Sequence, residues 1–183
     1  MKILLIGSGG REHALAWSLA DSPMTTRLVI APGNPGMANY GELRQVEADD
    51  IDGLCALAQD INADLVVIGP EVPLVMGLAD RLEGLGIPAF GPSAAAAKLE
   101  GSKEFARAFC QRHDVPQPAY FPVNDYESAC QHIDQLRGYC VVKANGLAAG
   151  KGVVVADDVE TADRKSTRLN SSHSQQSRMP SSA

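Results

Sequence analysis

Short apolar runs that end in glycine or proline alternate with helical patterns in the first half of the chain, and this alternation limits it to few folds. Three such runs, "KILLIG", "RLVIA" and "ADLVVIGP", are predicted to be buried strands at residues 2–7, 27–31 and 63–70. Helices are predicted over residues 11–20, 51–61 and 74–85, and "IPAFGP" is predicted to be a further short strand. Strands joined by helices form right-handed βαβ units, so the sequence predicts an α/β fold with an open parallel sheet.

The pattern changes after this region. A long helix is predicted over residues 94–113, with Ser93 as its N-cap and Gly101 as a weak point inside it. "VPQP" at residues 115–118 breaks the helical pattern, so we place a domain boundary between residues 114 and 115. A helix over residues 125–136 and a strand–turn–strand segment, "VVKANGLAAGKGVVV", follow in a second region over residues 115–163.

Residues 164–183, "RKSTRLNSSHSQQSRMPSSA", differ in character from everything before them. The segment contains seven serines, four basic residues and no acidic residue, and it has no helical or strand period. A natural disordered tail is one interpretation. The interpretation that we favour is a non-native tail that does not continue the preceding domain.

Composition excludes several classes of function. The formal net charge is −6, whereas a nucleic-acid-binding surface requires clusters of basic residues. No apolar run is long enough to span a bilayer, and "MKILLIG" is too short for a signal peptide. The four cysteines are scattered without metal-binding spacing, which favours reduced thiols in a cytoplasmic protein over a zinc site.

The turn "GSGGREHA", which follows the first predicted strand and opens the first helix, is the first candidate site. Glycines allow a ligand to approach the backbone, and the amides of a helix N-terminus favour an anion. The turn is a poor match to the dinucleotide fingerprint, because Glu12 stands where the third glycine belongs and no ribose-binding acid follows the second strand. Glycine-rich loops at residues 7–10, 33–36 and 69–70 are expected to gather at the carboxyl edge of the sheet, where Glu71 could accept hydrogen bonds from sugar hydroxyls. The alternatives are a tight turn without a ligand and a solvated carboxylate.

The turn "GLAAGKG", at residues 146–152, is the second candidate site. It is not the phosphate loop of nucleoside triphosphatases, because three residues rather than four separate its first two glycines and Gly152 follows the lysine. A hairpin with a mobile tip is predicted, in which Lys143 holds a fixed place on a strand and Lys151 could close over a phosphate. A solvated hairpin with surface lysines is the alternative. Lys103 in "EGSKEFARAF" is likewise either a phosphate-binding residue or a solvated lysine on a helix face.

Five motifs in this order and spacing carry a resemblance to a known family: "GSGGREHALAW", "APGNPG", "GPEVPLVMGLAD", "FGPSAAAAKLEGSKEFARAF" and "VVKANGLAAGKGVVV". Over residues 1–163 the chain closely resembles the phosphoribosylamine–glycine ligases (glycinamide ribonucleotide synthetases), which are ATP-grasp enzymes of purine biosynthesis. The resemblance implies an N-terminal pre-ATP-grasp domain that binds a sugar phosphate at residues 1–114, and the beginning of an α+β ATP-grasp small lobe at residues 115–163. It implies ATP-dependent ligation of glycine to 5-phosphoribosylamine, with glycinamide ribonucleotide, ADP and phosphate as products.

The resemblance also implies roles for individual residues. Gly9 and Gly10 would hold the sugar 5-phosphate, and Asn34, Gly36 and Glu71 would line the sugar site. ATP would be bound by Lys103, Lys143 and Gly146, and by Gly150, Lys151 and Gly152, which would form the flexible flap. Asn145 stands where the family usually has Asp, and we assign it no role.

The implied cofactors are ATP and Mg²⁺ or Mn²⁺, and the implied partners are small-molecule substrates in the cytoplasm, with neither nucleic acid nor membrane. Metal ligands and catalytic residues of the family would lie beyond Asp163, so this segment alone is expected to be inactive. Two alternatives stay open: a non-catalytic module that binds a sugar phosphate or nucleotide, and another ATP-grasp ligase of purine metabolism. A NAD-dependent oxidoreductase is disfavoured by the missing third glycine.

Overall fold

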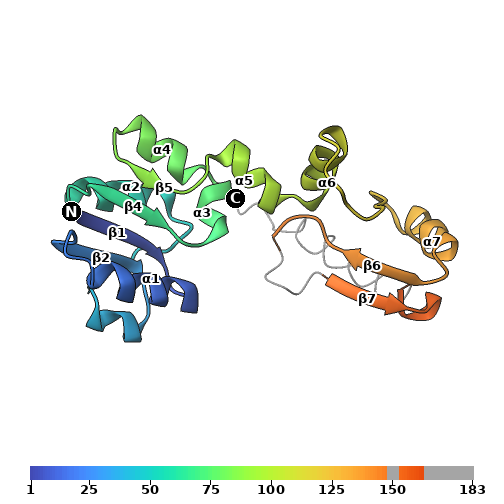
Figure 1. The fold of residues 1–183 in the computed structure, drawn as a ribbon, viewed down its shortest axis with the longest axis horizontal. Helices are drawn as coiled ribbons and strands as arrows, with labels where there is room; N and C mark the ends of the chain where they lie inside the picture. Colours follow the sequence, from blue (N-terminus) through green and yellow to red (C-terminus); the bar gives the residue numbers. More distant parts are fainter. Residues whose placement is uncertain (148–152, 163–183) are drawn as a thin grey trace, which may run out of the picture. The chain divides into compact units, whose positions relative to one another are not determined.

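The computed structural model describes residues 1–147 and 153–162. The chain forms two compact units, the first spanning Met1–Gly101 and the second beginning at Ser102 (Figure 1). The sequence-based boundary lay later, between residues 114 and 115. The two differ because the stretch 103–112 groups with the segments that follow it and not with the parallel sheet before it.

The first unit is built on a five-stranded parallel sheet, which confirms the predicted α/β class. The strand order is β3-β2-β1-β4-β5, with β1 in the centre, paired to β2 on one side and to β4 on the other. The strands are β1 (Lys2–Gly7), β2 (Arg27–Pro32), β3 (Glu42–Leu43), β4 (Leu65–Ile68) and β5 (Ala89–Phe90). The two-residue strand β3, at one edge of the sheet, has no counterpart in the sequence prediction.

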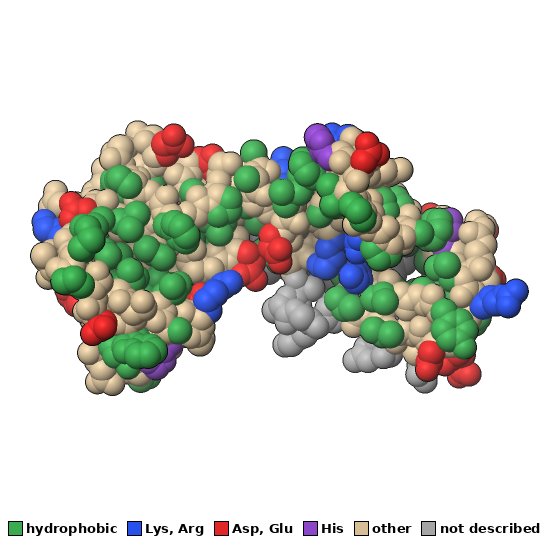
Figure 2. All heavy atoms as spheres, viewed as in Figure 1, with side chains coloured by type: hydrophobic (Ala, Val, Ile, Leu, Met, Phe, Trp, Pro, Cys, Tyr) green, Lys and Arg blue, Asp and Glu red, His purple; other side chains and the backbone are tan. Residues whose placement is uncertain are grey.

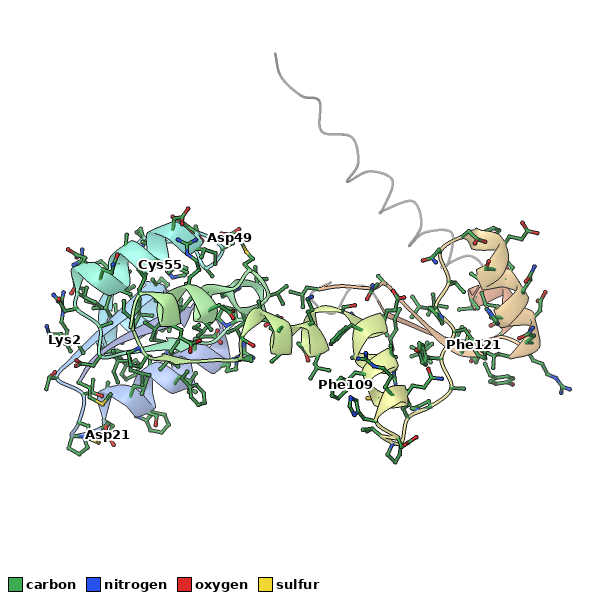
Figure 3. All side chains as sticks on the ribbon, turned by 90° about the horizontal axis from the view of Figure 1, so that it is seen from above. Lys2, Asp21, Asp49, Cys55, Phe109 and Phe121 are labelled. Atoms are coloured by element: carbon green, nitrogen blue, oxygen red, sulfur yellow. The ribbon has the colours of Figure 1, made fainter. Side chains whose placement is uncertain are left out.

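Helices cover both faces of this sheet (Figure 1). They are α1 (Gly10–Ala20), the 3-10 helix η1 (Pro35–Asn39), α2 (Ile51–Asp60), α3 (Glu71–Val75), α4 (Leu78–Gly84) and α5 (Ala94–Gly101). Alternate residues of β1 point to opposite faces, so Leu4 packs in a cluster with α2 and α4, while Leu5 packs in a second cluster with α1 and η1. Cys55, labelled in Figure 3, lies in the first cluster, where burial raises the pKa of its thiol.

Two predicted helices are each divided in the structure. The helix expected over residues 74–85 is interrupted at Gly77, which has a left-handed φ of 87° and separates α3 from α4. The long helix expected over residues 94–113 is interrupted at Ser102, whose extended backbone ends α5 and whose hydroxyl caps the next helix through Phe105 N. Of the two aspartates that the sequence offers as a cap before residue 51, Asp49 and Asp50, it is Asp50 that caps α2: its Oδ1 accepts a hydrogen bond from Gly53 N at 2.9 Å.

In the described part of the second unit, α7 (Tyr126–Gln135) and an antiparallel hairpin match the predicted helix and strand–turn–strand, whereas α6 (Lys103–Arg112) comes from the long helix that was predicted to belong to the first domain. The strands of the hairpin are β6 (Tyr139–Lys143) and β7 (Val153–Asp157). The hairpin register pairs Lys143 with Val153, and residues 148–152 of the predicted turn at 146–152 lie outside the described residues. Its apolar core is small and centres on Ile133 and Ala156, whereas aromatic rings such as Phe109 and Phe121, labelled in Figure 3, stack against neighbouring histidines.

Within the described part of the chain, no helix has the length and apolar character needed to cross a membrane.

Truncation of a fully buried core side chain should destabilise the first unit selectively. Leu54→Ala removes a side chain that is 0% exposed, so we expect the free energy of unfolding to fall by about 2–5 kcal/mol. The matched control is Leu99→Ala, at a side chain that is 44% exposed, and its loss should stay below about 1 kcal/mol. Urea unfolding followed through the amide signals of β1 measures both; equal losses in the two variants would contradict the assigned core.

Candidate functional site

The three glycine-rich turns of the first unit follow β1, β2 and β4, and they lie next to one another. Gly33 N donates a hydrogen bond to Gly7 O at 3.2 Å, and Gly69 N donates to Ile6 O at 3.0 Å. Gly7 ends β1 with a φ of 124°, a conformation that other residues rarely adopt. The expected gathering of these turns at the carboxyl edge of the sheet is therefore confirmed.

The carboxylate of Glu12 lies beneath the first and third of these turns. Glu12 is the one buried charged residue in the described part of the chain, at 4% exposure. Its Oε2 accepts from Gly9 N at 2.9 Å, and its Oε1 accepts from Arg11 Nε at 2.8 Å. A Cβ atom on Gly69 would lie only 2.4 Å from Glu12 Cγ, so the side chain fits only because that turn is glycine. Glu12 thus fills the space below both turns.

The bond from Gly9 to Glu12 changes what the first turn can offer a ligand. Gly9 and Gly10 were both predicted to hold a phosphate. The N–H of Gly9 is already engaged by a carboxylate at 2.9 Å, whereas Gly10 is exposed at the first position of α1, where amides have no acceptor within the helix. In this geometry the amide of Gly9 is occupied, whereas the amide of Gly10 is one that the helix itself leaves without an acceptor.

Arg11 and Glu71 lie at the mouth of the same turns. Arg11 Nη2 is 3.6 Å from Glu71 Oε2, while its Nε is bonded to buried Glu12. The hydrogen bond to Glu12 raises the pKa of Arg11, so its guanidinium stays charged. Glu71 is the first residue of α3 and its side chain is 46% exposed, so its carboxylate is accessible, as the sequence prediction required.

Asn34 and Gly36 shape the turn after β2. Asn34 Oδ1 accepts from Gly36 N at 2.9 Å and caps the 3-10 helix η1, and its Nδ2 donates to Ser8 O at 2.9 Å. Both polar groups of the Asn34 side chain are therefore engaged: Oδ1 holds the second turn itself, and Nδ2 joins that turn to the first. Asn34 and Gly36 lie at the predicted place, but the contacts of Asn34 are structural ones.

An open pocket of about 410 Å³ lies at this edge of the sheet. It is lined by Arg11, Gly69, Glu71, Leu74, Pro92, Ala97 and Glu100. A larger pocket of about 490 Å³ lies beside α4 and β5, and its charged lining residues are Asp80 and Glu83. We assign the candidate site to the smaller pocket, because only that one includes a glycine turn and a cation.

In the second unit, Lys103 and Gly146 are in direct contact although they are far apart in sequence. Lys103 Nζ donates to Gly146 O at 2.7 Å, which ties the first turn of α6 to the segment after β6. Asn145 strengthens the same junction, since its Oδ1 accepts from Ser102 Oγ at 3.2 Å and from Glu104 N at 3.3 Å. Figure 2 shows Lys or Arg side chains gathered between α6 and β6.

Lys143 is exposed at the last position of β6, three residues before the carbonyl that Lys103 contacts. The predicted ATP-binding residues Gly150, Lys151 and Gly152 lie outside the described residues. Within residues 1–147 and 153–162, no group of three His, Cys, Asp or Glu side chains is arranged to hold a metal ion.

Three residues with defined contacts had no role in the sequence prediction. Glu12 entered the prediction only as the residue that replaces the third glycine of the dinucleotide fingerprint. A Glu at the third position of a helix is, however, a known signal for a capping box. Arg11 could have been noticed as its neighbour on the same turn. Asn145 gave no local signal, because its partners Ser102 and Glu104 are more than forty residues away.

Two models of one protein family match the chain in succession. The model described as "Phosphoribosylglycinamide synthetase, N domain" matches residues 1–100. The model described as "Phosphoribosylglycinamide synthetase, ATP-grasp (A) domain" matches residues 101–175. The junction of the two matches, between residues 100 and 101, lies one residue before the division of the structure after Gly101.

Relatives of known name and solved structures agree with this match. A phosphoribosylamine–glycine ligase from Caulobacter vibrioides is 59% identical over 163 residues, and one from Phenylobacterium zucineum is 56% identical over 158 residues. These alignments cover 89% and 86% of this chain but only 38% and 37% of the two relatives, so the chain spans well under half of their length.

Two solved structures resemble the fold. The phosphoribosylamine–glycine ligase of Thermotoga maritima has a TM-score of 0.74 at 27% identity, covering 92% of this chain and 39% of that one. The N5-carboxyaminoimidazole ribonucleotide synthetase of Thermus thermophilus has a TM-score of 0.70 at 25% identity, covering 91% of this chain and 44% of that one.

The packing of Glu12 against the third turn predicts the effect of a single methyl group. In Gly69→Ala the new Cβ would overlap Glu12 Cγ, so we expect the free energy of unfolding to fall by about 1–3 kcal/mol. Gly84→Ala is the matched control, since no atom lies within 4 Å of its added Cβ, and it should leave stability unchanged or raise it by up to about 1 kcal/mol. Urea unfolding of both variants is the measurement, and a Gly69→Ala variant as stable as Gly84→Ala would contradict the packing described.

Proposed function

The chain belongs to the phosphoribosylglycinamide synthetase family, and from this premise we propose that it is the sugar-phosphate-binding domain and the first part of the ATP-binding lobe of an ATP-dependent ligase. The proposed reaction joins glycine to 5-phosphoribosylamine and releases glycinamide ribonucleotide, ADP and phosphate. The observation that carries the proposal is the match of two consecutive models of this one family, which together reach from residue 1 to residue 175.

In this proposal the first unit binds the sugar phosphate at the glycine turns. The exposed amide of Gly10 is placed to donate to the phosphate, since helix N-termini favour anions. Glu71 would accept hydrogen bonds from the sugar hydroxyls, and its exposure beside the 410 Å³ pocket supports this role. Gly9, Asn34 and Gly36 would act by shaping the turns, because the amide of Gly9 and the side chain of Asn34 already have partners.

The second unit would bind the phosphates of ATP. Lys103 and Lys143 are the proposed cations. The contact of Lys103 with Gly146 supports a shared role, because it brings Lys103 next to the segment that follows Lys143. Gly150, Lys151 and Gly152 are proposed as the flap over the nucleotide. In phosphoryl transfer the protein mainly positions the reactants and offsets the charge on the migrating phosphate, which is a task that lysines perform.

Mg²⁺ or Mn²⁺ is the proposed companion of ATP. The biotin carboxylase domain of Hydrogenobacter thermophilus 2-oxoglutarate carboxylase, which shares this fold at 20% identity, was crystallised with MgADP. The described residues include no cluster of acidic or His ligands that fits such an ion, so we derive no step through it. When bound, the ion would neutralise phosphate charge.

Competing functions are less well supported. Another ATP-grasp ligase of purine metabolism, such as a carboxyaminoimidazole ribonucleotide synthetase, has the same fold but only 25% identity, against 59% for the Caulobacter glycine ligase. A non-catalytic module that binds a sugar phosphate or nucleotide is the second candidate. The proposed substrates are small molecules and the proposed location is the cytoplasm.

A chimera tests the proposed reaction. The aligned 163-residue segment of the Caulobacter relative is replaced by the corresponding segment of this chain, and ADP release is measured. We expect release that requires both glycine and 5-phosphoribosylamine. ADP release that does not depend on glycine would contradict the proposal, as would a chimera that folds but is inactive while the unmodified relative is active.

The same chimera tests the proposed role of Lys103. Lys103→Met removes a cation that would contact the nucleotide phosphates. We therefore expect kcat/KM for ATP to fall at least about tenfold, which corresponds to the loss of one charge-assisted hydrogen bond. Lys98→Met, at an exposed lysine of α5, is the matched control and should retain the activity of the chimera. Equal activity of the two variants would remove Lys103 from the ATP site.

A further inference from the structure

Arg11 differs from the other paired arginines of the first unit in how its guanidinium is held. Arg27, Arg44 and Arg81 each use a terminal nitrogen to contact an exposed carboxylate at 2.7 Å. Arg11 instead donates its Nε to Glu12, whose side chain is only 5% exposed. The first type of contact is an ordinary surface ion pair, whereas the second fixes one edge of the guanidinium and leaves its two terminal nitrogens to other partners.

The anchor of Arg11 is itself rigid. Glu12 is held by the Gly9 amide at 2.9 Å and packed under Gly69, so its carboxylate has little freedom to move. The carboxylate of Glu71 lies farther away, with its Oε2 at 3.6 Å from Arg11 Nη2, which is longer than a normal hydrogen bond. A fixed guanidinium with an incompletely satisfied terminal nitrogen is an arrangement suited to binding an incoming anion.

The pocket next to Arg11 restricts what that anion can be. Among the described residues that line the 410 Å³ pocket, Arg11 is the one cation, and Glu71 and Glu100 are the other charged side chains. One phosphate can be placed against Arg11, but a second phosphate in the same pocket would meet two carboxylates. Hydroxyl and amino groups, in contrast, can donate hydrogen bonds to Glu71 and Glu100. The chemistry therefore fits a single phosphomonoester on a polyhydroxylated or amino-bearing group.

We propose that Arg11 is a specificity-determining residue of the sugar-phosphate site: its terminal guanidinium nitrogens donate to the phosphate of the sugar phosphate, while Glu71 is released from Arg11 to accept from sugar hydroxyls. This inference rests on the proposed function of the first unit and adds the group that distinguishes a phosphorylated sugar from the free sugar. The backbone amides of Gly10 and Arg11, in the first turn of α1, supply further donors on the same segment.

The experiment measures binding of ribose 5-phosphate and of ribose to the 183-residue chain by isothermal titration and by NMR. We expect the wild-type chain to bind ribose 5-phosphate more tightly than ribose, with a shift of the Arg11 Nε–Hε signal that ribose does not produce. Arg11→Gln should weaken binding of ribose 5-phosphate at least about tenfold and leave binding of ribose unchanged. Arg81→Gln, which removes an exposed arginine paired with Asp52 in the same unit, is the matched control and should bind like the wild type.

Arg11→Lys and the wild-type NMR titration keep the test decisive if Arg11→Gln does not fold. Lysine retains a positive partner for Glu12 but lacks the planar fork, so we expect an intermediate loss of affinity for ribose 5-phosphate. If wild-type binding is detected and neither the Arg11 signal nor the affinities of the Arg11 variants change, this inference is wrong while the proposed function stands. If the wild-type chain binds no ribose 5-phosphate, both are wrong.

Discussion

The burial of one carboxylate, that of Glu12, is the constraint on which the carboxyl edge of the sheet depends. A buried charge costs several kcal/mol unless it is paired and hydrogen-bonded, and here the Gly9 amide and Arg11 Nε supply both compensations. Space for the side chain requires glycine at residue 69, because any Cβ there would overlap it. The sequence of both turns, the start of α1 and the orientation of Arg11 thus follow from one buried side chain.

Much of the fold could be predicted because its signals are local. The apolar run of residues 2–7 has no room for a long helix and ends at a glycine, so it is a strand in any compact arrangement. The cap at Asp50 acts on an amide three residues away, and the hairpin of β6 and β7 is marked by β-branched residues on both sides of a glycine-rich turn. The meeting of the glycine turns followed from topology, since parallel strands end at a shared edge.

What escaped prediction depends on contacts between distant segments. The helix break at Ser102 is reinforced by Asn145, whose side chain bonds to Ser102 and to the amide of Glu104 across more than forty residues. At the site, the position of Gly9 was predicted but the engagement of its amide was not, because that depends on the rotamer of Glu12. The left-handed turn at Gly77 is a further case, since glycine is also tolerated within a helix and its φ is set by packing.

In the proposed reaction the two units would use different cations for different tasks, and the difference follows from the chemistry of that reaction. The sugar phosphate is not altered at its phosphate, so a guanidinium fixed on a rigid carboxylate can hold that group in one place throughout. The phosphate of ATP that is transferred must change its position during the reaction, and a lysine, as a point charge on a flexible stem, can follow it. Lys103 would meet that requirement, because its ammonium donates to the backbone carbonyl Gly146 O, in a bond that a phosphate oxygen can replace. Fixed recognition in the first unit and an exchangeable contact in the second are therefore what a ligase of this kind requires of its two phosphate sites.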